Sequence, residues 1–271
     1  MSAKKRILFI ANEMSPYLEL TEFSEIVNKL AIKANDNNFE VRCIMPRFGI
    51  INERRHRLHE VVRLSGMNII IDDDDYPLII KVASLPGMRL QVYFLDNEEF
   101  FKRKFMFHDE DGTPFEDNED RMIFFCKGVI ETIRKFGWPA DYIHCLGWMT
   151  ALIPFYLKTA YKNDPILNKF KIIYTPYKED ISGFFTSEFI NKASINNLEP
   201  EDLKPFIKNK EVTLIESALA FTDGIIIGSE ELDESISKAI KKLKGVAVLP
   251  YVGPDEMQKA YIDFYQKLLG E

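Results

Sequence analysis

The chain has 271 residues, 46% of them hydrophobic, and its 35 lysine and arginine residues are outnumbered by 42 aspartate and glutamate residues. This composition supports a packed core, while the formal net charge of -7 disfavours nucleic acid and anionic membranes as partners. No apolar run approaches the roughly 20 residues that span a bilayer, and the run at 7–11 is too short for a signal peptide. Because Cys43, Cys126 and Cys145 are far apart in the sequence, we expect reduced thiols in a cytoplasmic protein.

The chain begins with the pattern of a strand, a helix and a second strand. Residues 7–11 form a short apolar run that is typical of a strand buried on both faces. Apolar residues recur at helical spacing over 22–36, which predicts an amphipathic helix. The next apolar run, 41–45, is ended by Pro46. A strand, a helix and a strand in this order predict a βαβ unit and therefore a parallel sheet.

Residues 59–96 interrupt this pattern with short apolar runs separated by turn signals, which predicts an inserted β-meander. One of the turns contains the acidic run Asp72–Asp75. Adjacent aspartates could hold a divalent cation, but oxygen-ligand loops space their ligands, so we interpret this run as a solvated turn. We expect residues 97–117 to form a long surface loop.

From residue 118 the alternation of helices and strands resumes and continues to the end of the chain. The predicted elements are helices at 118–136, 150–161 and 210–220, strands at 142–145, 171–175, 224–227 and 246–249, and short helices and loops at 183–209. Ser229 is expected to cap the helix that follows it, and Pro254 to begin the last helix. We therefore interpret residues 1–271 as a single α/β domain, a doubly wound, mostly parallel Rossmann-like sheet with an inserted meander.

The common signatures of catalysis and cofactor binding are missing from the sequence. There is no glycine-rich phosphate-binding loop, no C-x-x-C pair and no G-x-S-x-G nucleophile elbow. The four histidines lack metal-ligand spacing, so we predict neither a metal site nor a cofactor. His144 ends a predicted strand, at the edge where open α/β sheets bind ligands, although a lone histidine there is more often a satisfied structural residue.

Several segments share the order and spacing of one known family. They are Arg6–Pro16 (RILFIANEMSP), Val41–Gly49 (VRCIMPRFG), Val92–Asp96, Glu99–Arg103, Asp117–Phe125, Pro139–Cys145, Trp148–Pro154 and Ala220–Ser229. Together they resemble the N-terminal domain of bacterial glycogen and starch synthases over residues 6–235.

This resemblance implies the GT-B architecture, in which two Rossmann-like domains face each other across a cleft. It implies an activity as well: transfer of glucose from ADP-glucose to an α-1,4-glucan, with retained configuration and without a metal ion. In that family the second domain grips most of the nucleotide. We expect this chain to comprise the first domain alone, with residues 254–269 as the analogue of the helix that crosses back onto it.

Three departures from the family pattern fall on positions that carry its chemistry. Glu19–Phe23 stands where the family has Lys-Thr-Gly-Gly-Leu, so a cation and the glycines that let a backbone approach phosphate are lost. Leu146 and Gly147 stand where the family has a histidine and an aspartate, and leucine cannot form hydrogen bonds. Tyr177 and Lys178 replace a further histidine and an asparagine. We therefore predict no catalytic residue and no independent transferase activity.

The resemblance also implies a sugar or glucan site on the old acceptor surface. The candidate residues are Glu13, Tyr17, Asp117, Asn118, Arg121, His144, Trp148 and Tyr177. Aromatic side chains suit sugar faces, but Trp148 could equally pack in the core at a helix start. The expected partner is an α-glucan or maltooligosaccharide. The alternatives are a subunit that pairs with another chain, or with itself, through the face left by the second domain, and a transferase with rearranged residues.

Overall fold

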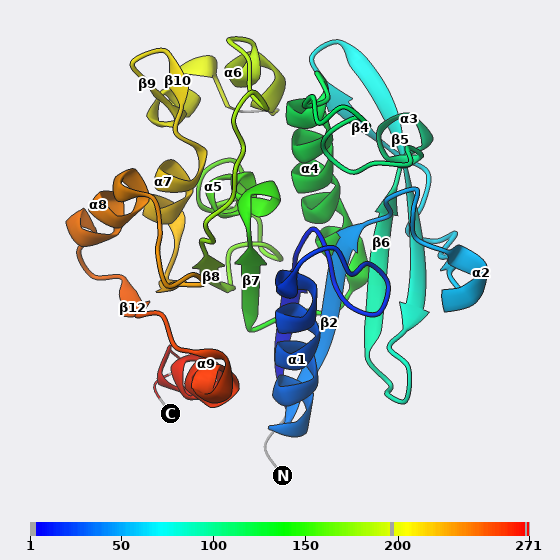
Figure 1. Cartoon of the computed structure of the whole chain (residues 1–271), viewed down its shortest axis with the longest axis vertical. Coiled ribbons are helices and arrows are strands. Elements are labelled where there is room, and N and C mark those ends of the chain that lie inside the picture. The colour runs from blue at the N-terminus through cyan, green and yellow to red at the C-terminus, as the bar shows by residue number, and fades with distance from the viewer. Residues whose placement is uncertain (1–3, 196–197, 269, 271) are drawn as a thin grey trace.

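A single ten-stranded sheet runs through the structure, a computed structural model that describes residues 4–195, 198–268 and 270 (Figure 1). Its strands are β1 (Lys5–Ile10), β2 (Phe39–Pro46), β3 (His59–Glu60), β4 (Met67–Ile71), β5 (Asp74–Ser84), β6 (Gln91–Asp96), β7 (Tyr142–Leu146), β8 (Lys171–Thr175), β11 (Gly224–Ile226) and β12 (Ala247–Leu249). The strand order is β12-β11-β8-β7-β1-β2-β6-β5-β3, with β4 paired on β5. Neighbours from β12 to β6 are parallel, whereas β5 is antiparallel to β3, β4 and β6. The predicted mostly parallel sheet with an inserted meander is therefore confirmed.

Helices and single 3-10 turns flank this sheet and connect its strands. They are α1 (Glu22–Asp36), α2 (Glu53–His56), α3 (Glu98–Phe101), α4 (Asn118–Phe136), η1 (Trp148–Thr150), α5 (Leu152–Lys158), α6 (Phe189–Ala193), η2 (Pro200–Phe206), α7 (Leu214–Ala218), η3 (Leu219–Phe221), α8 (Glu234–Lys242) and α9 (Pro254–Leu268). A separate two-stranded hairpin pairs β9 (Ile207–Lys208) with β10 (Glu211–Val212).

Strand β1 lies inside the sheet because its sequence can be buried on both faces. Its residues Ile7 to Ile10 are each no more than 1% exposed, as expected of a parallel strand covered by helices on both sides. Ile7 lies opposite Val41 of β2 and opposite Tyr142 of β7. The strand therefore joins the two halves of the sheet.

Most predicted elements occur close to their expected positions. Helices 22–36 and 118–136 and strand 171–175 have the predicted bounds. The helix predicted at 150–161 is shorter, because a 3-10 turn precedes it and α5 ends at Lys158. The helix predicted at 210–220 was wrong in its first half, where the hairpin strand β10 precedes α7.

Ser229 does not cap a helix, contrary to the prediction from sequence. Helix α8 begins at Glu234, directly after Asp233. The hydroxyl of Ser229 instead accepts a hydrogen bond from the backbone N–H of Lys178, at 3.0 Å. This contact fastens the chain after β11 to the chain after β8.

The last helix, α9, packs onto the sheet through a buried tyrosine. The hydroxyl of Tyr265 lies 2.8 Å from Nδ1 of His144, and its backbone carbonyl accepts a hydrogen bond from the hydroxyl of Tyr142. At the start of β11, a Cβ on Gly224 would approach the ring of Phe264 to 3.1 Å, so this glycine lets the helix close onto the strand. The helix was predicted over 254–269; residue 269 lies outside the described residues. Its equivalence to the family's crossover helix stays a prediction.

Replacing Tyr265 with phenylalanine tests this anchor. The substitution keeps the ring but leaves a buried imidazole nitrogen of His144 without its hydroxyl partner, which should lower the free energy of unfolding by about 1–3 kcal/mol. Urea denaturation measures the change. The matched control is Tyr251→Phe, because Tyr251 is 37% exposed; it should change the free energy by less than about 0.5 kcal/mol. Equal unfolding midpoints for Tyr265→Phe and the wild type would contradict the assignment.

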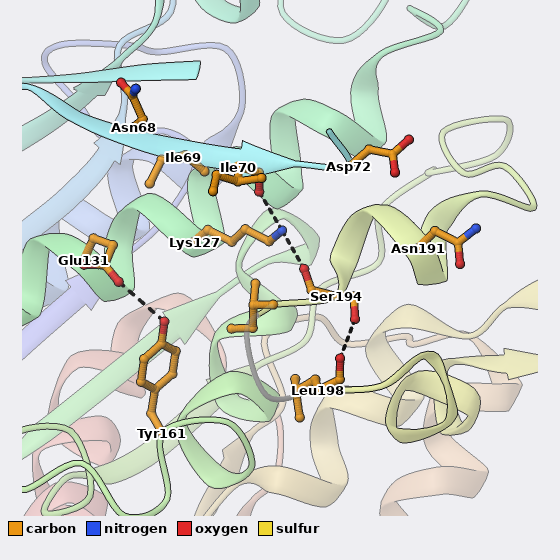
Figure 2. A pocket seen from close by; sticks show the side chains of 11 residues that line it. Asn68, Ile69, Ile70, Asp72, Lys127, Glu131, Tyr161, Asn191, Ser194 and Leu198 are labelled. Carbon is orange, nitrogen blue, oxygen red and sulfur yellow. Dashed lines mark hydrogen bonds between the residues drawn. The ribbon is translucent and has the colours of Figure 1, made fainter. Parts of the chain in front are cut away.

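A buried lysine ties α4 to the hairpin strand β4 and to the end of α6. The ammonium of Lys127 donates hydrogen bonds to the carbonyls of Ile70 (2.8 Å), Lys192 (3.0 Å) and Ser194 (2.8 Å). These bonds occupy all three of its N–H groups. Figure 2 shows Lys127 reaching from α4 between the other two segments. The lysine therefore holds the edge of the meander onto the second half of the fold.

Replacing Lys127 with methionine should destabilise the protein by about 2 kcal/mol, because three enclosed carbonyls lose a donor while the aliphatic packing is kept. Thermal or urea unfolding measures the loss. Lys135→Met on the exposed side of the same helix is the control and should change stability by less than about 0.5 kcal/mol. If both variants unfold alike, Lys127 does not tie these elements together.

Candidate functional site

A hollow opens where the strand order reverses, at the carboxyl ends of β1 and β7. From β1 the chain proceeds outward through β2 and β6, and from β7 it proceeds the other way through β8 and β11. The loops that leave β1 and β7 therefore diverge, and open α/β sheets bind ligands at such points. The hollow has a volume of about 520 Å³, and we call it the Trp148 pocket. It is lined by Asn12, Glu13, Leu20, Thr21, Phe23, Phe105, Met106, Phe107, His108, Asp109, Trp148, Tyr177, Lys178, Glu179, Asp180, Phe184 and Ser229.

One wall of the Trp148 pocket is aromatic. The indole of Trp148 lies edge-on to the rings of Phe107 and Phe184, with a centroid distance of 5.1 Å to each. Trp148 itself is only 3% exposed, so little of its indole surface is accessible from the pocket. Tyr177 continues the wall and lies edge-on to Phe23 of α1, at 4.6 Å.

The buried carboxylate of Glu13 shapes the loop between β1 and α1. It accepts hydrogen bonds from the backbone N–H groups of Leu20 (3.2 Å) and Thr21 (3.3 Å) and from the hydroxyl of Thr21. The same hydroxyl accepts a hydrogen bond from the N–H of Phe23 at the start of α1, as an N-cap does. Glu13 therefore fixes the rim of the pocket.

A second carboxyl group, that of Glu179, lies beside Gly147 at the end of β7. Its Oε2 accepts a hydrogen bond from the backbone N–H of Trp148 at 2.8 Å. The pKa of Glu179 is raised to about 8, mainly by burial and also by the nearby charge of Glu13, while the hydrogen bond from the Trp148 N–H opposes the shift. Gly147 has a φ of 80°, in the region that favours glycine. At neutral pH the Glu179 carboxyl is therefore mostly protonated and can both donate and accept.

The residues that the sequence analysis singled out fall into two groups. Glu13, Trp148 and Tyr177 line the pocket. Tyr17 does not; its buried ring packs edge-on against Phe94, at 5.0 Å. The remaining candidates, Asp117, Asn118, Arg121 and His144, also lie outside the lining.

Arg121, at the start of α4, is fully buried and holds the long loop that follows α3. Its guanidinium donates hydrogen bonds to the backbone carbonyls of Phe100 (2.7 Å) and Met106. Because Met106 and its neighbours form one side of the pocket, Arg121 positions that side without reaching the hollow.

Asn118 and Asp117 support the same loop from the beginning of α4. The amide of Asn118 donates to the carbonyl of Phe107 at 2.8 Å. The carboxylate of Asp117 accepts two hydrogen bonds from the guanidinium of Arg103, at 2.6 and 2.5 Å. Such a bidentate pair fixes geometry as well as charge. These side chains therefore shape the aromatic wall from behind.

His144 is buried inside the sheet. Its Nε2 lies 2.7 Å from the hydroxyl of Thr175, and its Nδ1 is paired with Tyr265 of α9. Burial lowers the pKa of His144 to about 3, so the imidazole stays neutral at physiological pH. It joins β7, β8 and α9.

The structure also shows the surroundings of the residues that depart from the family pattern. Leu146 is fully buried at the end of β7. The carboxylate of Glu19 accepts a hydrogen bond from Ser15 within the same loop, at 2.7 Å, and the ammonium of Lys178 is 3.5 Å from the carboxylate of Glu231.

Sequence reasoning missed several lining residues, chiefly Asn12, Phe107, Phe184 and Glu179. Asn12 is the second residue after β1, which was a usable signal. Phe107 lies in a loop rich in aromatic residues, but the sequence did not show which of them face inward. Nothing in the sequence indicated that Glu179 lines the pocket, because its position beside Gly147 depends on the conformation of the turn after β8.

The described residues contain no group of three or more His, Cys, Asp and Glu side chains that could hold a metal ion. Asp72 and Asp73 form an exposed turn between β4 and β5, whereas Asp74 and Asp75 are exposed residues of β5, so the turn is shorter than predicted. All three cysteines are buried and free. In the same part of the chain, no helix is long and apolar enough to cross a bilayer.

Comparison with known proteins identifies the family. The model of the starch synthase catalytic domain matches residues 6–247. The chain therefore belongs to the starch synthase catalytic domain family, and its fold is that of the N-terminal Rossmann-like domain of the GT-B architecture.

Curated relatives are bacterial glycogen synthases. The protein of Pelodictyon phaeoclathratiforme is 31% identical over 234 residues, which cover 85% of this chain and 47% of that protein. That of Chlorobaculum tepidum is 32% identical over 248 residues, covering 87% and 50%. The chain thus spans about half the length of the curated relatives it matches.

A solved structure shares the fold. The catalytic domain of Starch Synthase IV from Arabidopsis thaliana, bound to ADP and acarbose, superposes with a TM-score of 0.73 at 17% identity. The match covers 94% of this chain and 53% of that one.

The raised pKa of Glu179 predicts a pH-dependent effect of Glu179→Gln on stability. Between the ordinary glutamate pKa of 4.5 and about 8, the folded state holds a proton that the unfolded state has released. The wild type therefore loses stability as pH rises through this window, whereas the glutamine variant does not. Between pH 5 and pH 8, the free energy of unfolding of Glu179→Gln should rise by about 1–2 kcal/mol relative to that of the wild type. This is less than the full pKa shift would give, because the side chain is partly exposed.

Urea denaturation at both pH values measures this gain. Glu116→Gln, which removes an exposed carboxylate from a loop, is the control and should show no comparable pH dependence. A difference between Glu179→Gln and the wild type that is the same at pH 5 and pH 8 would contradict the raised pKa.

Proposed function

We propose that this domain binds a neutral α-1,4-glucan or maltooligosaccharide in the Trp148 pocket and does not transfer glucose on its own. The observation that carries the proposal is the pairing, in one hollow at the reversal point, of an aromatic wall with carboxyl and amide oxygens. Carbohydrates present apolar C–H surfaces beside hydroxyl groups, and such a lining complements both. The family membership supports a glucan as the ligand.

The charges around the pocket support a neutral ligand. The acidic residues Glu13, Asp109 and Asp180 line it, and the cation of Lys178, which also lines the pocket, is 3.5 Å from the carboxylate of Glu231. A diphosphate would meet several carboxyl groups, and like charges a few ångström apart repel by about 1–4 kcal/mol between water and a protein surface.

The residue types beside the pocket support the proposal that this domain does not transfer glucose. Leu146, which aligns with a histidine of the family, is enclosed in the sheet and has no polar atom in its side chain. The loop at 19–22 carries Glu19 and Glu22 where the family has a lysine and a glycine. Loss of one preorganised electrostatic donor typically slows catalysis by about 10²–10³-fold, and several such groups differ here.

Maltohexaose binding tests the ligand. We expect the oligosaccharide to quench the fluorescence of Trp148, measured in a Trp138→Phe background because Trp138 pairs with Glu40 away from the pocket. Phe105→Ala should weaken binding several-fold, since Phe105 lines the pocket and is 36% exposed. Ile166→Ala is the control, because Ile166 is an apolar side chain outside the pocket that is 47% exposed. No quenching and no heat in calorimetry would overturn the glucan proposal.

Incubation with labelled ADP-glucose and maltohexaose tests transfer. We expect no labelled polymer to form, even when the protein is as concentrated as the maltohexaose. Chain elongation by this polypeptide alone would overturn the non-catalytic part of the proposal and favour a transferase with rearranged residues.

A second candidate function is docking of another protein over the same edge of the sheet. Leu20 and Phe105 are 56% and 36% exposed at the pocket rim, and a cluster of exposed apolar side chains often marks an interface. Purification from native cells tests it. A companion that is released by Leu20→Lys supports docking, and a clean monomer speaks against it.

A further inference from the structure

The floor of the Trp148 pocket has two polar oxygens facing one small space beside Gly147. A Cβ at position 147 would lie 3.2 Å from Oε1 of Glu179 and 3.4 Å from Oδ1 of Asn12. Any side chain at this position would therefore cover both oxygens, and the positive φ would strain it as well. Glycine keeps this space between the two oxygens free of a side chain.

The Asn12 oxygen lacks a partner within the described chain. Asn12 is 5% exposed, and its Oδ1 is buried without a hydrogen bond. A buried acceptor that is left unsatisfied costs about 1–3 kcal/mol, and buried polar groups normally have partners. Because Asn12 also lines the hollow, a group that enters the pocket can satisfy it.

Glu179 offers the complementary group on the other side of the same space. Its Oε2 is occupied by the N–H of Trp148. The described residues provide no hydrogen bond to Oε1, so this atom remains for a ligand. A protonated carboxyl at Oε1 donates, whereas Asn12 Oδ1 accepts, and a hydroxyl group can do both at once.

From this geometry we propose that Asn12 and Glu179 are the specificity-determining residues of the Trp148 pocket, and that they select an uncharged hydroxyl group of the ligand over a phosphate. The inference rests on the proposed function, since it assigns the polar contacts of the same site. In this proposal Glu179, which comes from the loop after β8, contacts the ligand at the end of β7.

The charges that face Glu179 give the site a pH dependence of known sign. The titratable groups that line the pocket with Glu179 are Glu13 from the loop after β1, His108 and Asp109 from the long loop, and Lys178 and Asp180 beside it, and Glu13 is the one whose charge raises the pKa of Glu179. A neutral ligand that covers the pocket removes water from Glu179 and so favours its protonated form. Binding should therefore weaken as pH rises above about 8, the pKa of the free site.

The experiment compares four variants with the wild type by calorimetry, using maltohexaose as the probe and glucose 1-phosphate as the anionic counterpart. At pH 7, Glu179→Gln should bind maltohexaose within about twofold of the wild type, because an amide can also donate and accept. Glu179→Ala and Asn12→Ala should each bind about tenfold more weakly, the loss of one buried hydrogen bond. Glu116→Gln, an exposed carboxylate outside the lining, should bind as the wild type does.

The pH series supplies the second readout. Between pH 7 and pH 9, maltohexaose binding should weaken several-fold in the wild type and stay constant in Glu179→Gln. Glucose 1-phosphate should bind more weakly than maltohexaose to the wild type at both pH values. Circular dichroism of each variant shows whether a loss of binding reflects a loss of fold.

The possible failures separate the two proposals. If the wild type does not bind maltohexaose, the glucan function fails and this inference fails with it. If the wild type binds but the two alanine variants bind equally well, only the inference fails. Preferential binding of glucose 1-phosphate would also overturn the inference, because the two residues would then not select an uncharged group.

Discussion

The structure depends on the parallel pairing of β1 with β2 on one side and β7 on the other. The run Ile7–Ile10 can be buried on both faces, so β1 takes the interior place in the sheet. Because later strands are added outward in both directions, the chain reverses at β1 and β7. The loops that leave these strands must separate, and the Trp148 pocket is the space between them.

Buried polar side chains hold the walls of this pocket in place. Glu13 fixes the loop before α1, Arg121 holds the long loop after α3, and His144 joins β7 and β8 to α9. Each is enclosed and forms hydrogen bonds that offset the cost of desolvation, although the Nη2 nitrogen of Arg121 has no partner among the described residues. Glutamate, arginine and histidine are residue types common in catalytic sites. Here they are buried, so they position other residues.

The site was predictable in part. Glu13, Trp148 and Tyr177 were assigned to it because the family resemblance implies a sugar site there, and the structure places all three in the lining. Arg121 and His144 were assigned with them, yet both turn inward. The sequence pattern shows where a residue lies along a helix or strand. It does not show whether a long side chain turns inward to a loop or outward to the solvent.

By itself, the sequence determined the class of fold, the order of strands and helices and the family, because these depend on the periodicity of apolar residues and on local motifs. The tertiary structure alone decided which polar groups face the pocket. Asn12, Gly147 and Glu179 are far apart in the chain and come together only where β1, β7 and the turn after β8 meet. That meeting depends on a backbone turn at Gly147 and on the packing of three loops, which neighbouring residues in the sequence do not specify.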